Sequence, residues 1–109
     1  MIEAMSYLMP YIKGTLREWS VVKILIAGVP TVHLRGRLNK EQMVIVTSEI
    51  YSVIFMGVLG CGIRTKYGNI YIVQGMPDKH YTEMVGVQSV NWQFPRNIFR
   101  HIVNQSGVK

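Results

Sequence analysis

A glycine-centred hairpin signal between residues 59 and 73 constrains the fold of this chain more than any other feature of its sequence. The dipeptide Tyr67-Gly68 stands between two runs rich in β-branched and aromatic residues, Ile63–Lys66 and Asn69–Val73. Glycine readily adopts the positive φ of a tight turn, and the flanking residue types favour extended backbone. The pattern predicts two antiparallel strands and a mainly β protein.

Other β-prone segments precede and follow this hairpin. Residues 19–26 form one run, and residues 31–38 form a second that contains Gly36, where a glycine within a strand marks a bend or bulge. Residues 75–79 are typical of a turn, and residues 84–92 predict a further strand.

Segment 43–56 has two interpretations. Asn39, followed three residues later by Gln42, resembles a helix capping box. The density of valine, isoleucine and threonine instead favours two strands that are broken near Ser48-Glu49, because β-branched side chains lose rotamer freedom in a helix. We favour the strands.

Both ends of the chain predict short helices. Apolar residues recur at helical spacing over residues 2–9, and Pro10 limits this helix, which we place within residues 1–13. Pro95 suits the first turn of a helix over residues 95–104, whose apolar stripe consists of Ile98, Phe99, Ile102 and Val103. We predict one domain over residues 1–109, with a β-barrel core at 19–92.

Composition narrows the function classes. Twelve basic and six acidic residues give a net charge of +6, which favours polyanionic partners. Cys61 is the single cysteine, which excludes an intrachain disulfide and favours a reducing compartment. The longest apolar stretch, residues 50–63, is shorter than the roughly 20 residues of a membrane-spanning helix. Residues 1–5 lack a secretory pattern, so we expect a cytoplasmic protein that does not enter a membrane.

Two stretches resemble the paired signature motifs of the Sm and Sm-like family, in the family's order. Residues 32–38, followed by residues 43–46, are similar to the first motif's bent strand with an internal glycine and its methionine-bearing strand. Leu59-Gly60, Ile63-Arg64 and Asn69–Ile72 resemble the second motif.

The resemblance implies a small, strongly bent, five-stranded barrel that assembles into a homo-oligomeric ring and binds nucleic acid, RNA above all. Arg64 and Asn69 are the residues that match the family's nucleic-acid contacts. The family's aspartate before the methionine, asparagine after it and glycine after the arginine are replaced here by Lys40, Val44 and Thr65.

Two groups of residues are candidates for contacting RNA or single-stranded DNA. Arg35 and Arg37, with Lys40, would form a phosphate-binding stripe, because residues two apart on a strand share a face. Lys66 and Tyr67, beside Arg64, would combine positive charge with a stacking ring at the hairpin tip.

Catalysis and metal binding have little support in the sequence. The spacing of Asp78, His80 and Glu83 is not that of a zinc site, and Cys61 among glycines is typical of a buried inert thiol. We predict a binding protein without catalytic residues, cofactor or metal. The alternative hypothesis is a structural or regulatory protein–protein interaction module of viral or mobile-element origin. The candidates for contacting nucleic acid or a partner protein at this end are Trp92, Phe94, Phe99, Arg96 and Arg100, although we favour a C-terminal helix packed on the barrel.

Overall fold

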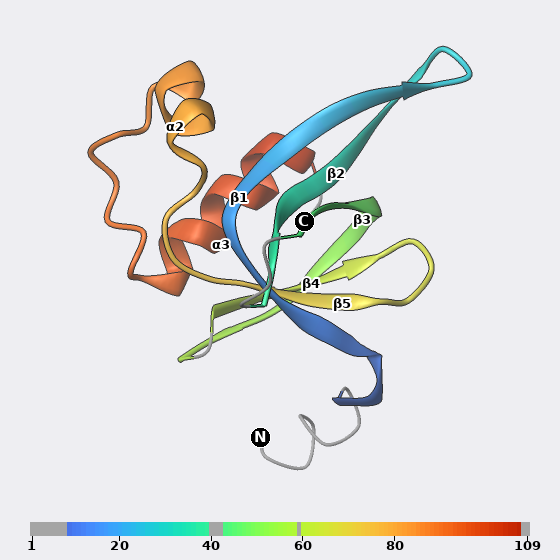
Figure 1. Cartoon of the computed structure of the whole chain (residues 1–109), viewed down its shortest axis with the longest axis horizontal. Coiled ribbons are helices and arrows are strands. Elements are labelled where there is room, and N and C mark those ends of the chain that lie inside the picture. The colour runs from blue at the N-terminus through green and yellow to red at the C-terminus, as the bar shows by residue number, and fades with distance from the viewer. Residues whose placement is uncertain (1–8, 40–42, 59, 108–109) are drawn as a thin grey trace.

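The fold is a closed barrel of five strands in chain order (Figure 1). A computed structural model describes residues 9–39, 43–58 and 60–107, apart from the side chains of residues 55 and 56. The strands are β1 (Ile12–Ile26), β2 (Val29–Leu38), β3 (Val44–Gly57), β4 (Gly60–Thr65) and β5 (Ile70–Val73). Consecutive strands pair antiparallel, and β5 closes the barrel by pairing in parallel with the start of β1. The predicted mainly β barrel is confirmed.

A bulge bends β1 where the sequence predicts a bend in β2. The register shifts between the pairs Arg17–Arg37 and Ser20–Arg35, which leaves one extra residue on β1. Gly36 faces this bulge, and a Cβ on it would lie 3.2 Å from the carbonyl oxygen of Arg17. The glycine therefore lets the bulged strand approach its regular neighbour.

Segment 44–57 is one long strand, so the strand interpretation of this region is confirmed over a helix. The break predicted near Ser48-Glu49 is instead a bulge. His33 and Arg35, two residues apart on β2, pair with Glu49 and Val46, which are three residues apart on β3. The strand β3 therefore carries one extra residue at this point. This irregularity bends β3 so that its first half pairs with β2 and its second half with β4.

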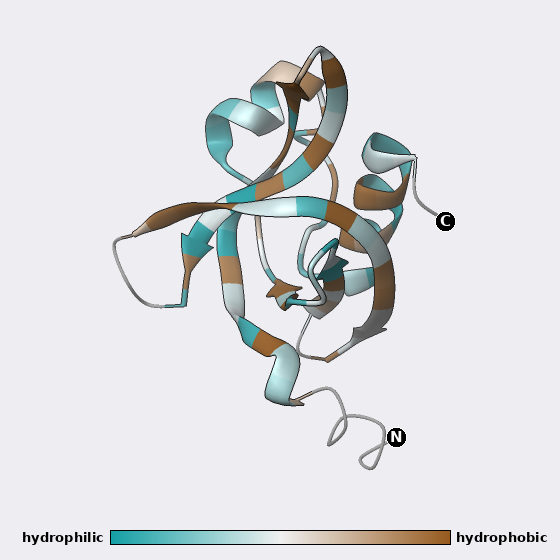
Figure 2. Ribbon diagram, turned by 90° about the vertical axis from the view of Figure 1, so that its right-hand side faces the viewer, coloured by the Kyte–Doolittle hydropathy of each residue, from teal (hydrophilic) through white to brown (hydrophobic). Residues whose placement is uncertain are grey.

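The β1–β2 hairpin extends beyond the barrel (Figure 1). Its loop is Ala27-Gly28, and both residues have positive φ, 49° and 78°, as a two-residue type I′ turn requires. The colouring of Figure 2 marks the end of this hairpin as apolar, where Ile24, Leu25, Ile26 and Val29 are exposed.

Two helices follow the barrel, α2 (Lys79–Val85) and α3 (Pro95–Ser106). The predicted C-terminal helix is confirmed, with Pro95 in its first turn. The predicted strand at 84–92 is wrong. Asp78 caps α2 by accepting a hydrogen bond from the Tyr81 amide, and Gly86 ends the helix with a φ of 71°. The barrel core consequently spans 12–73 rather than 19–92.

The N-terminal helix predicted within residues 1–13 falls mostly outside the described residues. Met9–Tyr11 forms a single 3-10 turn, and β1 begins at Ile12, so Ile12 and Lys13 are extended instead of helical. Within the described residues, no helix is long and apolar enough to cross a membrane.

The core joins the barrel to both helices through Trp19. This side chain is fully buried, and its indole N–H donates to the Gly75 carbonyl oxygen at 2.9 Å. Its ring lies 5.4 Å from that of Trp92, edge to face, and also contacts Tyr81 and His101. Trp92 therefore serves internal packing, as the packed-helix interpretation predicts.

Candidate nucleic-acid interface

One outward face of β2 carries the first predicted group. Because β2 runs without a bulge from Val29 to Leu38, alternate residues share a face. We call the set Thr31, His33, Arg35 and Arg37 the β2 face. Arg35 is exposed, and Arg37 donates to the carboxylate of Glu18 at 3.2 Å.

A third arginine extends this face and was not predicted from the sequence. Arg17 lies directly opposite Arg37 on β1, and its guanidinium donates to the side-chain oxygen of Gln74 at 3.0 Å. The strand predicted from the sequence begins only at residue 19, so Arg17 falls outside the predicted pairing with β2. The three guanidinium groups and one carboxylate give this end of the β2 face a net positive charge.

The opposite end of the β2 face meets the hairpin tip. Lys66 and Tyr67 line a cavity of about 380 Å³ together with Thr31, His33 and the acidic Glu49. The Tyr67 side chain is 78% exposed, which leaves its ring available for stacking. The structure thus brings Lys66 and Tyr67 of the β4–β5 turn to the same face as Arg35 and Arg37 of β2.

His33 is a structural member of this face. Its ring is buried, with Nδ1 2.8 Å from the Thr47 carbonyl oxygen and Nε2 2.7 Å from the Thr31 hydroxyl. Since the carbonyl can only accept, Nδ1 carries a proton and donates to it. The ring therefore fixes β2 to the bulged segment of β3.

The two residues that the family resemblance selects lie apart from this cavity. Arg64 is half-buried on β4, opposite Ser52 and Ile70, and its Nε is buried with no hydrogen-bond partner among the described residues. The carbonyl oxygen of Asn69 accepts from the amide and the hydroxyl of Thr65, which closes the hairpin turn. Lys40 and Leu59 lie outside the described residues.

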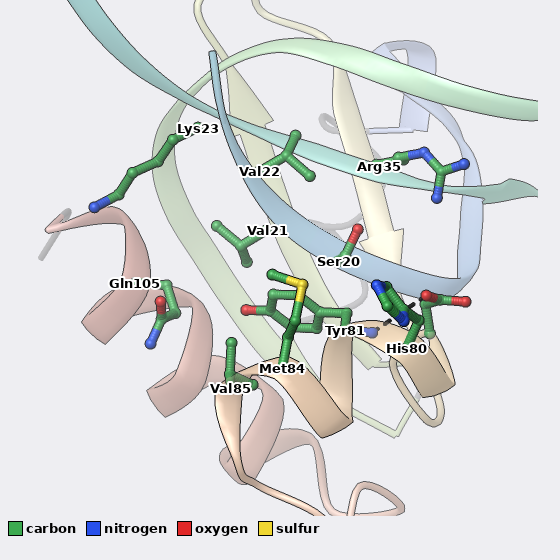
Figure 3. A pocket seen from close by; sticks show the side chains of 11 residues that line it. Ser20, Val21, Val22, Lys23, Arg35, His80, Tyr81, Met84, Val85 and Gln105 are labelled. Carbon is green, nitrogen blue, oxygen red and sulfur yellow. Dashed lines mark hydrogen bonds between the residues drawn. The ribbon is translucent and has the colours of Figure 1, made fainter.

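A second cavity, of about 450 Å³, lies between β1 and α2 (Figure 3). Val21, Val22, Tyr81, Met84 and Val85 form its apolar lining. Its charged and titratable lining consists of Lys23, Arg35, Asp78 and His80, which makes the wall amphipathic with an excess of positive charge.

The hydroxyl of Tyr81, which lines this cavity, makes two hydrogen bonds. It contacts Nε2 of His101, and a backbone hydrogen bond from Val21 also reaches it. Burial raises the pKa of Tyr81 to about 12, against the lowering effect of the Val21 hydrogen bond, and burial lowers the pKa of His101. At neutral pH both side chains are therefore uncharged, with the phenol donating to the imidazole.

Cys61 and Asp78 both occupy structural positions in the described part of the chain. Cys61 is buried, and desolvation raises its pKa to about 12, so the thiol stays protonated at neutral pH. Among the described histidine, cysteine, aspartate and glutamate residues, no three are grouped to hold a metal ion. The carboxylate of Asp78 is used instead as the cap of α2.

The geometry therefore gives a basic β2 face with an exposed aromatic ring at one end and an amphipathic cavity beside it. Searches of protein-family models, curated proteins and solved structures find no match for this chain.

Proposed function

We propose that this protein binds single-stranded nucleic acid, RNA above all, along the β2 face. The observation that supports the proposal is the alignment of Arg17, Arg37 and Arg35 at one end with Lys66 and Tyr67 at the other. Guanidinium groups pair with phosphate oxygens in a bidentate way, and an exposed tyrosine ring stacks on bases regardless of sequence. The net charge of +6 favours the same class of ligand.

The test is an anisotropy titration of a fluorescent single-stranded RNA at rising salt. Each phosphate contact on a single strand contributes about 0.7 to the slope of log affinity against log salt, so Arg35→Gln should reduce that slope by about 0.7. Arg96→Gln removes the same charge from α3 and is the matched control, which should leave the slope nearly unchanged.

Substitutions of Tyr67 test the proposed base stacking separately from the charge of the β2 face. Tyr67→Ala should weaken RNA binding by about 1–3 kcal/mol because a stacked base loses its platform, whereas Tyr67→Phe should retain most of the affinity. Absence of binding by the wild-type protein at low salt would overturn the proposal.

The family resemblance adds a homo-oligomeric ring to this proposal. Light scattering with simultaneous absorbance at the nucleic-acid wavelength would measure subunit number and bound nucleic acid together. A monomer at all concentrations, with or without RNA, would remove the ring from the proposal.

The exposed apolar end of the β1–β2 hairpin favours the second candidate function, a protein–protein interaction module. Leu25 is 71% exposed and Val29 59%, although both are large apolar residues on a projecting element. Contiguous exposed apolar groups of this kind mark interaction sites. Trp92, Ile98 and Ile102 are buried, so this second proposal uses the hairpin as the contact surface in place of Trp92–Val103.

A further inference from the structure

The outer half of β1 has an unpaired edge. β5 pairs with β1 only over Ile12–Leu16, and a single bridge joins Trp19 to Pro77. Among the described residues, no strand pairs with Val21–Ile26 on the side away from β2. An exposed strand edge of this kind is a template for another strand.

The register identifies the backbone groups on this edge. In an antiparallel ladder closed by a two-residue loop, Ile26 and Val29 exchange hydrogen bonds, and every second residue does so further along. Val21, Lys23 and Leu25 consequently direct their N–H and C=O groups away from β2. The backbone hydrogen bond from Val21 to the Tyr81 hydroxyl fits this orientation.

The cavity between β1 and α2 lies directly along this edge. Val21 and Lys23 line it from β1, and Met84 and Val85 line it from α2 (Figure 3). A strand added to β1 would therefore run beside an apolar pocket able to take one of its side chains, as in peptide recognition by strand addition.

The positive charge beside this edge distinguishes between a second copy of this chain, an acidic peptide and a nucleic acid as the added partner. In a symmetric antiparallel pairing of two copies about the middle of this edge, Lys23 would face Lys23, and like charges directly opposite are destabilising. Lys23 and Arg35 instead favour acidic side chains. A nucleic-acid backbone offers acceptors but lacks the alternating N–H and C=O groups that a strand edge pairs with.

We propose that β1 binds an extended, acidic segment of a partner protein as an added strand. The segment pairs with the backbone of Lys23 and Leu25 and places an apolar side chain against Met84 and Val85. It directs one carboxylate to Lys23 and another to Arg35, which project from opposite faces of the β1–β2 ribbon. The lining of this site has no residue in common with the cavity beside Lys66 and Tyr67, and Arg35 is the residue that it shares with the β2 face.

The probe is a short fluorescent peptide that repeats Glu-Glu-Val-Val, which places both residue types on each face of the added strand; its binding is measured by anisotropy. Its affinity for Lys23→Pro should be about tenfold lower than for Lys23→Gln, because proline removes the edge N–H while both variants remove the charge. Wild-type protein should also lose affinity for a peptide N-methylated on the residues that face β1, but not for one methylated on the alternate residues.

Backbone NMR should show that the peptide protects the amides of Lys23 and Leu25 from exchange. A control peptide carries lysine in place of every glutamate. The proposal is overturned if the glutamate peptide does not bind, if both methylated peptides bind equally, or if the control peptide binds with the same affinity as the glutamate peptide. Protection of the same amides by single-stranded RNA or by self-association, without peptide, would also overturn it. The methylated peptides keep the test decisive even if Lys23→Pro fails to fold.

Discussion

Gly60 shows at the scale of a single residue what the barrel requires to close. Its φ is 128°, a conformation that side chains disfavour, and an added Cβ would collide with the carbonyl oxygen of Val73. Gly57, three residues earlier, has no atom near the position of an added Cβ. The two glycines at the β3–β4 turn therefore have different roles: one permits a close approach and the other only ends a strand.

Gly60→Ala should accordingly lower the free energy of unfolding by about 2 kcal/mol or more, because strained backbone and a steric clash add together. Gly57→Ala is the matched control, with an expected change within about 0.5 kcal/mol. Urea denaturation followed by tryptophan fluorescence would measure both. Equal effects of the two substitutions would contradict the role assigned to Gly60.

At the scale of elements, α2 depends on its ends more than on its length. It has only seven residues, and it begins with the Asp78 side chain bonded to the Tyr81 amide. The helix ends at Gly86, whose amide bonds to the carbonyl oxygens of Thr82 and Glu83. A helix this short is marginal without caps and packing, and Tyr81 supplies the packing against Trp19.

Asp78→Ala should therefore destabilise the protein by about 1 kcal/mol, the usual cost of losing an N-cap side chain. Glu83→Ala removes an exposed carboxylate from the same helix and should have a smaller effect. Thermal unfolding by circular dichroism would compare the two variants. If Glu83→Ala were the more destabilising, capping would not be what holds α2.

The sequence predicts elements well where local chemistry and final structure agree. Tyr67-Gly68 and Pro95 each specify their turn or helix directly, and both predictions are confirmed. The strand predicted at 84–92 is wrong because its spaced valines are typical of a strand. The Asp78 cap and the terminating Gly86 instead specify a helix that ends within this region. The valines are instead partly buried against the core from a helix end and loop.

The candidate site was predictable only in part. The shared face of Arg35 and Arg37 follows from the two-residue period of a strand. The position of Arg17 opposite Arg37 depends on the bulge in β1, and the meeting of Lys66 and Tyr67 with His33 depends on the bend of β3. Such irregularities arise from tertiary pairing, so local patterns do not reveal them.

At the scale of the whole molecule, the cluster of Trp19, Tyr81, Trp92 and His101 links the barrel to both helices. Burial lowers the pKa of His101, so the folded state holds this imidazole neutral. The unfolded chain binds the proton more readily. The contribution of His101 to stability is therefore complete above the ordinary value of 6.5 and is lost as the pH falls toward the lowered folded-state pKa.

The free energy of unfolding should accordingly decrease as the pH falls below 6.5. His101→Gln should flatten this dependence, whereas His80→Gln, at an exposed histidine, should not. Urea denaturation at a series of pH values would separate the two variants. An unchanged pH dependence in His101→Gln would show that other groups cause it.

The parallel pairing of β5 with β1 also determines when the barrel can form during synthesis. Ile12 pairs with Ile70 and Leu16 with Val73, so the first strand finds its second neighbour only after the chain has been made through β5. Contacts this distant in sequence slow folding and leave intermediates with open strand edges. A nascent chain stalled before β5 would therefore expose the apolar side of β1. Closure of the barrel would have to wait until Ile70–Val73 has emerged from the ribosome.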